Sequence, residues 1–177
     1  MTQWILVMVY CAYCHSTVNY GIFWGNSPLS INIFRLQKKA VRIITNTRNR
    51  DSCTDLFKAP NIHLLQSHYI FSLVCFVAMI VDHYKVNLDI HGEDIRQGSK
   101  LHQTTSKLSH YLRGTYCMGI KIFSSLSFNI KYLSLNIKQF KWVLRNFFYS
   151  KSPYTLDEYF NYSSISDLGW LCNIFLL

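Results

Sequence analysis

The residues with the clearest capacity for chemistry are positive charges gathered in one short segment. Six cations stand between Arg35 and Arg50, and no acidic residue occurs before Asp51. Lys and Arg on one face of a helix match the geometry of phosphate contacts, which give affinity without sequence choice. We expect weak, non-specific binding of RNA or DNA, or else the ordinary solvated face of an amphipathic helix. The candidates are Arg35, Lys38, Lys39, Arg42, Arg48 and Arg50.

A second candidate group is Cys11-x-x-Cys14-His15, which has the spacing used for covalent haem attachment. The same residues could also give zinc two or three ligands, but a structural zinc site needs four. No second Cys-x-x-Cys or His-x-x-x-His pair completes such a site. We therefore expect neither a metal nor a cofactor. The other six histidines are expected at the surface: His63, His68, His83, His91, His102 and His110.

Composition limits the class of protein. The 177 residues are half hydrophobic and 16% aromatic, which is enough for one domain with a sizeable core. The 18 Lys and Arg against 9 Asp and Glu give a net charge of +9, which suits nucleic acid or an anionic membrane surface. The longest uncharged apolar run, 69–81, is shorter than the roughly 20 residues that span a bilayer. The irregular spacing of six cysteines favours a reducing compartment and an intracellular protein, nuclear or cytoplasmic.

Hydrophobic periodicity predicts a mostly α protein, an irregular helical bundle with a long polar loop around 86–109. In the helix expected near 30–45, the inward set is Ile33, Leu36, Ala40, Val41, Ile43 and Ile44. In the helix near 137–149, Phe140, Leu144, Phe147 and Phe148 point inward and Lys138, Lys141 and Arg145 outward. Further helices are expected at 1–19, with buried character, and at 52–58, 64–84, 116–126 and 156–160. We divide the chain into a helical region, 1–160, and an apolar tail, 161–177.

Several short motifs follow one another in a specific order. The run Tyr20-Gly21-Ile22-Phe23-Trp24-Gly25 precedes Leu36-Gln37-Lys38-Lys39-Ala40-Val41-Arg42. Later come Arg50-Asp51-Ser52-Cys53, Leu56-Phe57-Lys58, Tyr69-Ile70-Phe71-Ser72-Leu73, Gly119-Ile120-Lys121-Ile122-Phe123, Lys138-Gln139-Phe140-Lys141 and Tyr154-Thr155-Leu156-Asp157-Glu158-Tyr159-Phe160. In this order the chain resembles the C-terminal, thumb or post-palm part of the reverse transcriptase of jockey-like non-LTR (LINE-type) retrotransposons.

The resemblance implies a parent enzyme that copies RNA into DNA, with a palm that holds two metal ions on an Ala-Asp-Asp motif. This chain has no adjacent Asp pair, and it lacks the Gly-x-Ser-x-Gly and phosphate-loop motifs of other enzyme classes. We therefore expect a non-catalytic C-terminal fragment, at most a weak nucleic-acid-binding module. Two other possibilities stay open: a membrane-associated or protein-interaction protein built on the apolar runs, and a decayed reading frame without a selected function.

Overall fold

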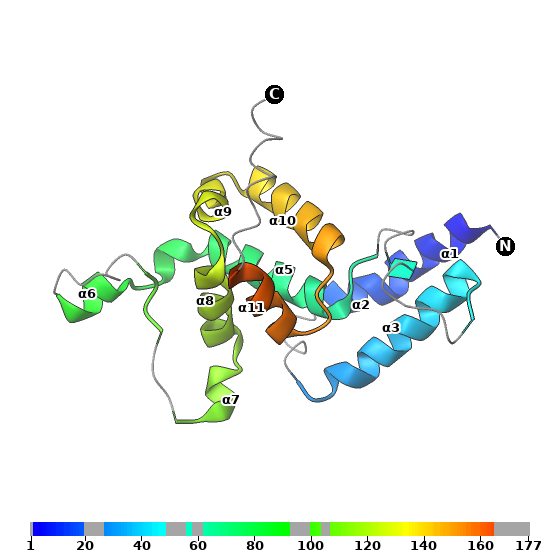
Figure 1. Ribbon diagram of the computed structural model, residues 1–177, viewed down its shortest axis with the longest axis horizontal. Helices are drawn as coiled ribbons and strands as arrows, with labels where there is room; N and C mark the ends of the chain where they lie inside the picture. The colour runs from blue at the N-terminus through cyan, green and yellow to red at the C-terminus, as the bar shows by residue number, and fades with distance from the viewer. Residues whose placement is uncertain are drawn as a thin grey trace. The chain divides into compact units, whose positions relative to one another are not determined.

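A computed structural model describes residues 2–19, 27–48, 56–57, 62–92, 100–103 and 107–164. The described chain is mostly α-helical, as the periodicity predicts (Figure 1). It divides into unit 1, Met1–Ser72 with Arg145–Leu156, and unit 2, Leu73–Leu144 with Asp157–Leu177. Among the described residues, no helix is both long and apolar enough to cross a lipid bilayer.

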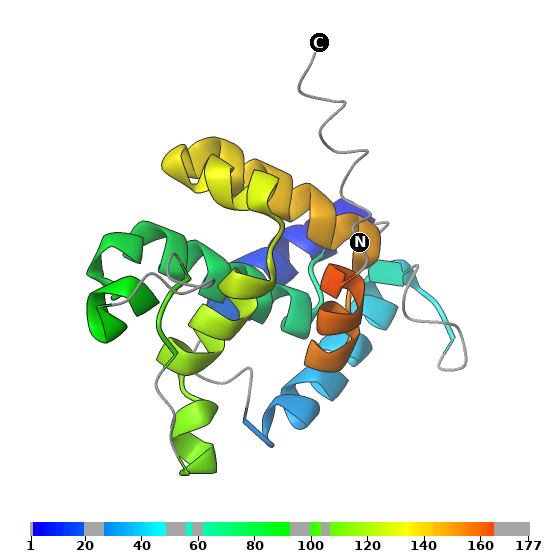
Figure 2. The same cartoon turned by 60° about the vertical axis from the view of Figure 1, so that its left-hand side comes forward.

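Unit 1 is built on two N-terminal helical segments and on parts of two later helices. The first segment runs through α1 (Gln3–Tyr10), the π-helical turn η1 (Cys11–His15) and α2 (Ser16–Asn19). The second is α3 (Ser30–Thr45), and α1 and α3 pack against each other (Figure 1 and Figure 2). The first part of α5 (Leu65–Met79) and the last part of α10 (Ile137–Lys151) complete the unit. Asn46, in the left-handed conformation with φ 52°, ends α3.

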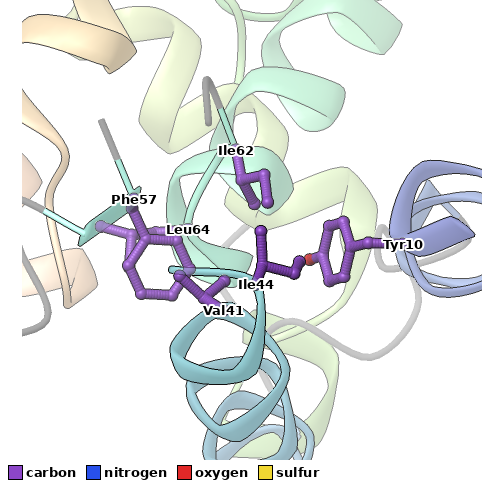
Figure 3. Packing of buried hydrophobic residues seen from close by; sticks show 6 residues of the cluster. All are labelled: Tyr10, Val41, Ile44, Phe57, Ile62 and Leu64. Carbon is purple, nitrogen blue, oxygen red and sulfur yellow. The ribbon is translucent and has the colours of Figure 1, made fainter. Parts of the chain in front are cut away.

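The core of unit 1 is a compact apolar cluster. α3 contributes Val41 and Ile44, and Tyr10 comes from the end of α1. Phe57, Ile62 and Leu64 join them from the segment before α5, and the side chains converge as Figure 3 shows. Burial of apolar surface contributes about 25 cal/mol per Å², so this cluster stabilises the position of α3.

The prediction that the N-terminal helix is buried was wrong. Trp4, Met8 and Tyr13 are exposed, whereas Tyr10 and Val18 are buried. Sequence analysis predicts that a helix with apolar residues on every side is buried. Here α1 packs on α3 along one side, so its remaining apolar residues face outward.

The inward face of α3 was also predicted incorrectly. Leu36 is 65% exposed and Ile43 is 69% exposed, whereas Gln37 is 5% exposed. At 100° per residue, this rotates the buried face by roughly 50° from the expected one. Val41 and Ile44 are buried as expected, and Ala40 packs against the cluster. The physical reason for the rotation is a set of hydrogen bonds to the Gln37 amide, described with the site below.

Unit 2 contains the remaining elements. They are the end of α5, η3 (Val81–His83), α6 (Asn87–His91), α7 (Ser109–Leu112), α8 (Thr115–Ser125), α9 (Phe128–Tyr132), η4 (Leu133–Leu135), the start of α10, and α11 (Leu156–Ser164). A Cβ on Gly119 of α8 would lie 2.7 Å from Val77 Cγ2 of α5, so α5 and α8 approach closely because this residue is glycine. Ile120, Ile122 and Phe140 are buried in this unit.

Most helix predictions in unit 2 are confirmed, but two need correction. The helices predicted at 116–126, 137–149 and 156–160 correspond to α8, α10 and α11. The helix predicted to reach residue 84 ends at Met79. The polar loop expected at 86–109 contains α6 and an antiparallel bridge between Val86 and Leu101. The Asp89 carboxylate accepts a hydrogen bond from the Val86 N–H at 3.2 Å, which favours the first turn of α6. Most of the predicted tail, from residue 165 onward, lies outside the described residues.

Candidate functional site

The basic residues of α3 occupy one side of the helix, as predicted. Arg35 and Lys39 are exposed and stand one turn apart, whereas Lys38 and Arg42 are half-buried. We call these four residues the basic face. Arg48 is exposed just beyond the end of α3, and Arg50 lies outside the described residues. Arg35 and Lys39 are therefore the members of the predicted set best placed for contact with a polyanion.

The two half-buried cations are held by the fold. The Lys38 ammonium lies 4.2 Å from the centroid of the Phe34 ring and 5.8 Å from that of Tyr154. A cation over an aromatic ring is attracted by about 0.5–1 kcal/mol at an exposed site. The Nε of Arg42 is buried and has no hydrogen-bond partner among the described residues. Both side chains thus contribute positive potential with less freedom to reach a phosphate.

Gln37 connects α3 to the segment that leads into α5. Its Nε2 donates to the Tyr10 hydroxyl and to the His63 carbonyl oxygen, both at 2.9 Å. Its Oε1 accepts a hydrogen bond from the Leu65 N–H at 3.0 Å. The Leu65 N–H belongs to the first turn of α5, where backbone donors have no partner within the helix. A buried amide with three partners is a structural anchor, and it fixes which side of α3 faces the core.

A second candidate site is a cavity of about 390 Å³ within unit 1. Its walls come from the N-terminal helix, from the residues at the start of α5 and from the end of α10. The lining residues are Tyr10, Cys11, His15, Ile62, His63, His68, Phe71, Arg145 and Tyr149. Volumes of 300–1,000 Å³ are typical of small-molecule sites.

Three histidine rings cluster in this cavity. The ring centroids of His15 and His68 are 4.9 Å apart, and those of His63 and His68 are 6.3 Å apart. The His63 ring also stacks on Tyr149, with centroids 4.0 Å apart and planes inclined by 14°. The ring nitrogens of His63 and His68 are all buried, and no hydrogen-bond partner for them lies among the residues that the structure describes.

The cavity disfavours protonation of its histidines. Burial, reinforced by the nearby His68, Arg145 and His15, lowers the pKa of His63 to about 3. Burial, with the charges of His15 and Arg145, lowers the pKa of His68 to about 4. The pKa of His15 is lowered as well, first by burial and then by Arg145. The three imidazoles are neutral near pH 7, and every charge that shifts them is positive.

The sequence analysis missed this cluster because it placed the histidines at the surface. That prediction was wrong for His63 and His68, which are 8% and 6% exposed. A signal existed in the pair His63-x-x-x-x-His68, whose members flank the apolar Leu64 and Leu65. The link to His15 had no sequence signal, since it depends on how the N-terminal helix packs.

The Cys-x-x-Cys-His motif lies on the π-helical turn, with the thiols of Cys11 and Cys14 free and exposed. Within the part of the chain that the structure describes, no three or more His, Cys, Asp or Glu side chains are arranged to hold a metal ion. His15 turns toward His68, so the motif does not gather its own three side chains around one point.

Comparison of the chain with protein-family models, with curated proteins and with solved structures found no match.

Proposed function

We propose that the chain is a non-catalytic piece of a non-LTR retrotransposon reverse transcriptase that retains weak, non-specific binding of RNA or DNA. The ordered motifs of the sequence support the family origin, and the absence of an adjacent Asp pair supports the lack of polymerase chemistry. The observation that carries the binding proposal is the exposure of Arg35 and Lys39 one turn apart on α3.

The expected mode of binding is contact with the phosphate backbone. Each Lys or Arg that neutralises a phosphate releases condensed counterions, so the affinity falls as salt is added. Four to six contacts by the basic face, Arg48 and Arg50 give a log–log salt slope of roughly −3 to −5. The dissociation constant expected at physiological salt is about 10⁻⁴ to 10⁻⁶ M. The binding has no sequence preference because phosphates carry no base identity.

The test reverses the two exposed charges. The Arg35→Glu/Lys39→Glu variant should lose affinity and flatten the salt slope by about two units, measured by fluorescence anisotropy with labelled RNA and DNA. These side chains are preferable to Lys38 and Arg42, whose change would also disturb packing. The matched control is Lys138→Glu/Lys141→Glu, which reverses two exposed charges on α10.

Two results would contradict the proposal. The first is binding that survives the α3 double variant and disappears in the α10 control, which would place the contact on α10. The second is primer extension by the purified chain with primed RNA, nucleotides and Mg²⁺, which would refute the non-catalytic assignment.

A second candidate function, as a protein-interaction or membrane-associated protein, is favoured by the N-terminal helix. Trp4, Met8 and Tyr13 are all exposed along it, and large exposed apolar groups mark interaction surfaces or sites of aggregation. Flotation with lipid vesicles, lost in a Trp4→Ser/Met8→Ser variant, would favour the membrane form of this function. If the isolated wild-type chain shows no cooperative unfolding transition, that result would instead favour the decayed reading frame.

A further inference from the structure

We propose that the histidine-lined cavity of unit 1 is a binding site for a small organic anion that carries a flat ring. All nine lining residues belong to unit 1, and none belongs to the basic face of α3. The site is therefore separate from the proposed nucleic-acid contact, and either can exist without the other.

The charge of the cavity selects an anion. Its titratable groups are Tyr10, Cys11, His15, His63, His68, Arg145 and Tyr149, and no acidic residue is among them. Burial is the first cause of the lowered pKa values of the three histidines, and repulsion from the positive Arg145 guanidinium lowers them further. A bound anion would relieve this repulsion, and Arg145 offers a planar fork of donors that suits a carboxylate, sulfonate or phosphate.

The walls of the cavity select a flat ring. The His63 ring is nearly parallel to Tyr149, at 14°, and to Phe71, at 13° with centroids 6.1 Å apart. These three residues, with Ile62, give the cavity aromatic and apolar surfaces alongside its charge. An inorganic ion would fill only a small part of about 390 Å³.

The unpaired ring nitrogens are the second independent sign of a ligand. Buried polar groups in proteins nearly always have hydrogen-bond partners, so an unpaired one calls for a partner such as a water, an ion or a ligand. Among the described residues, none pairs with the four ring nitrogens of His63 and His68, although both side chains are more than nine-tenths buried. An anionic ligand would accept hydrogen bonds from these rings, and its negative charge would favour their protonated form.

The experiment compares three probes that distinguish the contribution of the ligand's negative charge from that of its flat ring. Benzenesulfonate has both features, sulfate has only the charge, and benzyl alcohol has only the ring. Each is titrated into the full chain while the imidazole carbon-bound protons are followed by NMR. Benzenesulfonate should bind at least about tenfold more tightly than either partial probe, because it uses both Arg145 and the aromatic walls. Equal affinity for all three probes, or no binding of benzenesulfonate, would overturn the proposal.

Protonation of the histidines should make the affinity depend on pH, whereas simple filling of the cavity would not. The sulfonate keeps its charge across the useful pH range, so a change of its affinity with pH reports on the protein. Because the anion stabilises protonated imidazole, its binding should raise the pKa of His15 and His68 and strengthen as the pH falls below 6.5, toward the pKa of about 4 of His68 without ligand. A pH-independent affinity would contradict the proposed role of the histidines.

The matched variants are Arg145→Gln and Lys141→Gln, one turn apart on α10. The first should weaken benzenesulfonate binding about tenfold, and the second should leave it unchanged. Both should bind RNA like the wild-type chain, which separates this proposal from the basic face. Equal benzenesulfonate affinity in both variants would remove Arg145 from the site and overturn the proposal. If Arg145→Gln fails to fold, the probe series and the histidine titration in the wild-type chain still decide.

Discussion

Helices α3 and α10 look alike in sequence but differ in how well their sequence predicts their buried face. Both are amphipathic, of 16 and 15 residues, with cations on one side and apolar residues on the other. On α10, Phe140, Leu144, Phe147 and Phe148 are buried as predicted. On α3, two of the predicted inward residues, Leu36 and Ile43, are exposed, and Gln37 takes a central buried position.

The difference teaches that a single well-paired amide can rotate a helix against its own hydrophobic pattern. Periodicity counts apolar side chains, so it treats Gln37 as part of the polar side. The structure gives Gln37 partners at Tyr10, His63 and Leu65, two of them backbone groups. α10 was predicted correctly because its buried face is wholly apolar, which is the case that periodicity describes.

The largest expected effect is a loss of stability in acid. The two helices differ here in the chemistry of their buried contacts. Tyr149 of α10 stacks on His63, whereas the buried amide on α3 does not titrate. The folded pKa values of His63 and His68, about 3 and about 4, lie below the usual 6.5. The folded state therefore binds fewer protons, and its stability is complete above pH 6.5 and falls as the pH drops toward 4.

At about 1.4 kcal/mol for each pKa unit, the loss by pH 4 is on the order of several kcal/mol. Urea unfolding followed by circular dichroism at pH 7.5, 6 and 4.5 measures it. A His63→Phe/His68→Phe variant should lose most of this pH dependence. A wild-type chain whose stability does not change between pH 7.5 and 4.5 would show that the histidines are not buried as neutral groups.

The second effect compares one predicted core residue from each helix. Phe140→Ala on α10 should lower the free energy of unfolding by about 3–5 kcal/mol, because the side chain is fully buried. Ile43→Ala on α3 should change it by less than about 0.5 kcal/mol, since the side chain is largely exposed. Equal losses of unfolding free energy in the two variants, measured by urea unfolding, would show that Ile43 is buried as the sequence predicts.

The third effect compares substitutions at two adjacent positions of α3. Gln37→Ala should cost about 2–4 kcal/mol, because the Leu65 N–H and the His63 carbonyl lose their buried partner. The matched control Leu36→Gln places an amide at the neighbouring exposed position and should cost less than about 0.5 kcal/mol. Amide hydrogen exchange at Leu65 gives a local readout, which should accelerate in Gln37→Ala alone. Unchanged exchange there would disprove the anchoring role of Gln37.

The smallest effect concerns the cation over the rings. Lys38→Gln should cost about 0.5–1 kcal/mol through loss of the contact with Phe34. Lys39→Gln, at the exposed neighbouring position, should leave stability within about 0.5 kcal/mol of the wild type. A larger cost for Lys39→Gln than for Lys38→Gln would mean that Lys38 is not the packed member of the basic face.

The sequence predicts a helix wherever apolar residues recur with a single helical period. α8 and α10 were predicted for this reason, and the basic residues of α3 were placed on one side correctly. The end of α5 and the bridge between Val86 and Leu101 were missed, because each depends on particular backbone hydrogen bonds rather than on periodicity. The Asn87 N–H, for example, donates to the Lys100 carbonyl at 3.0 Å, a pairing between residues far apart in the sequence.

The candidate cavity could not be predicted because its members are brought together by packing. The sequence suggested Cys11 and His15 for one site and Arg145 for the outside of a helix. Arg145 is exposed on α10 as expected, yet it lines the same cavity as Cys11, His15, His63 and His68. Tertiary contacts of this kind have no counterpart in local spacing.

The π-helical turn at Cys11–His15 has a consequence for changes in chain length. A turn of this kind holds one residue more than an α-helical turn, so it corresponds to a one-residue insertion. Deleting Ala12 would let this turn close as a regular α-helix and would leave the residues before and after it on nearly their present faces. Tyr10 and His15 could then still both line the cavity. The N-terminal helix can thus lose one residue at this point, whereas the same loss within a regular α-helix would turn one part of it by about 100° against the other.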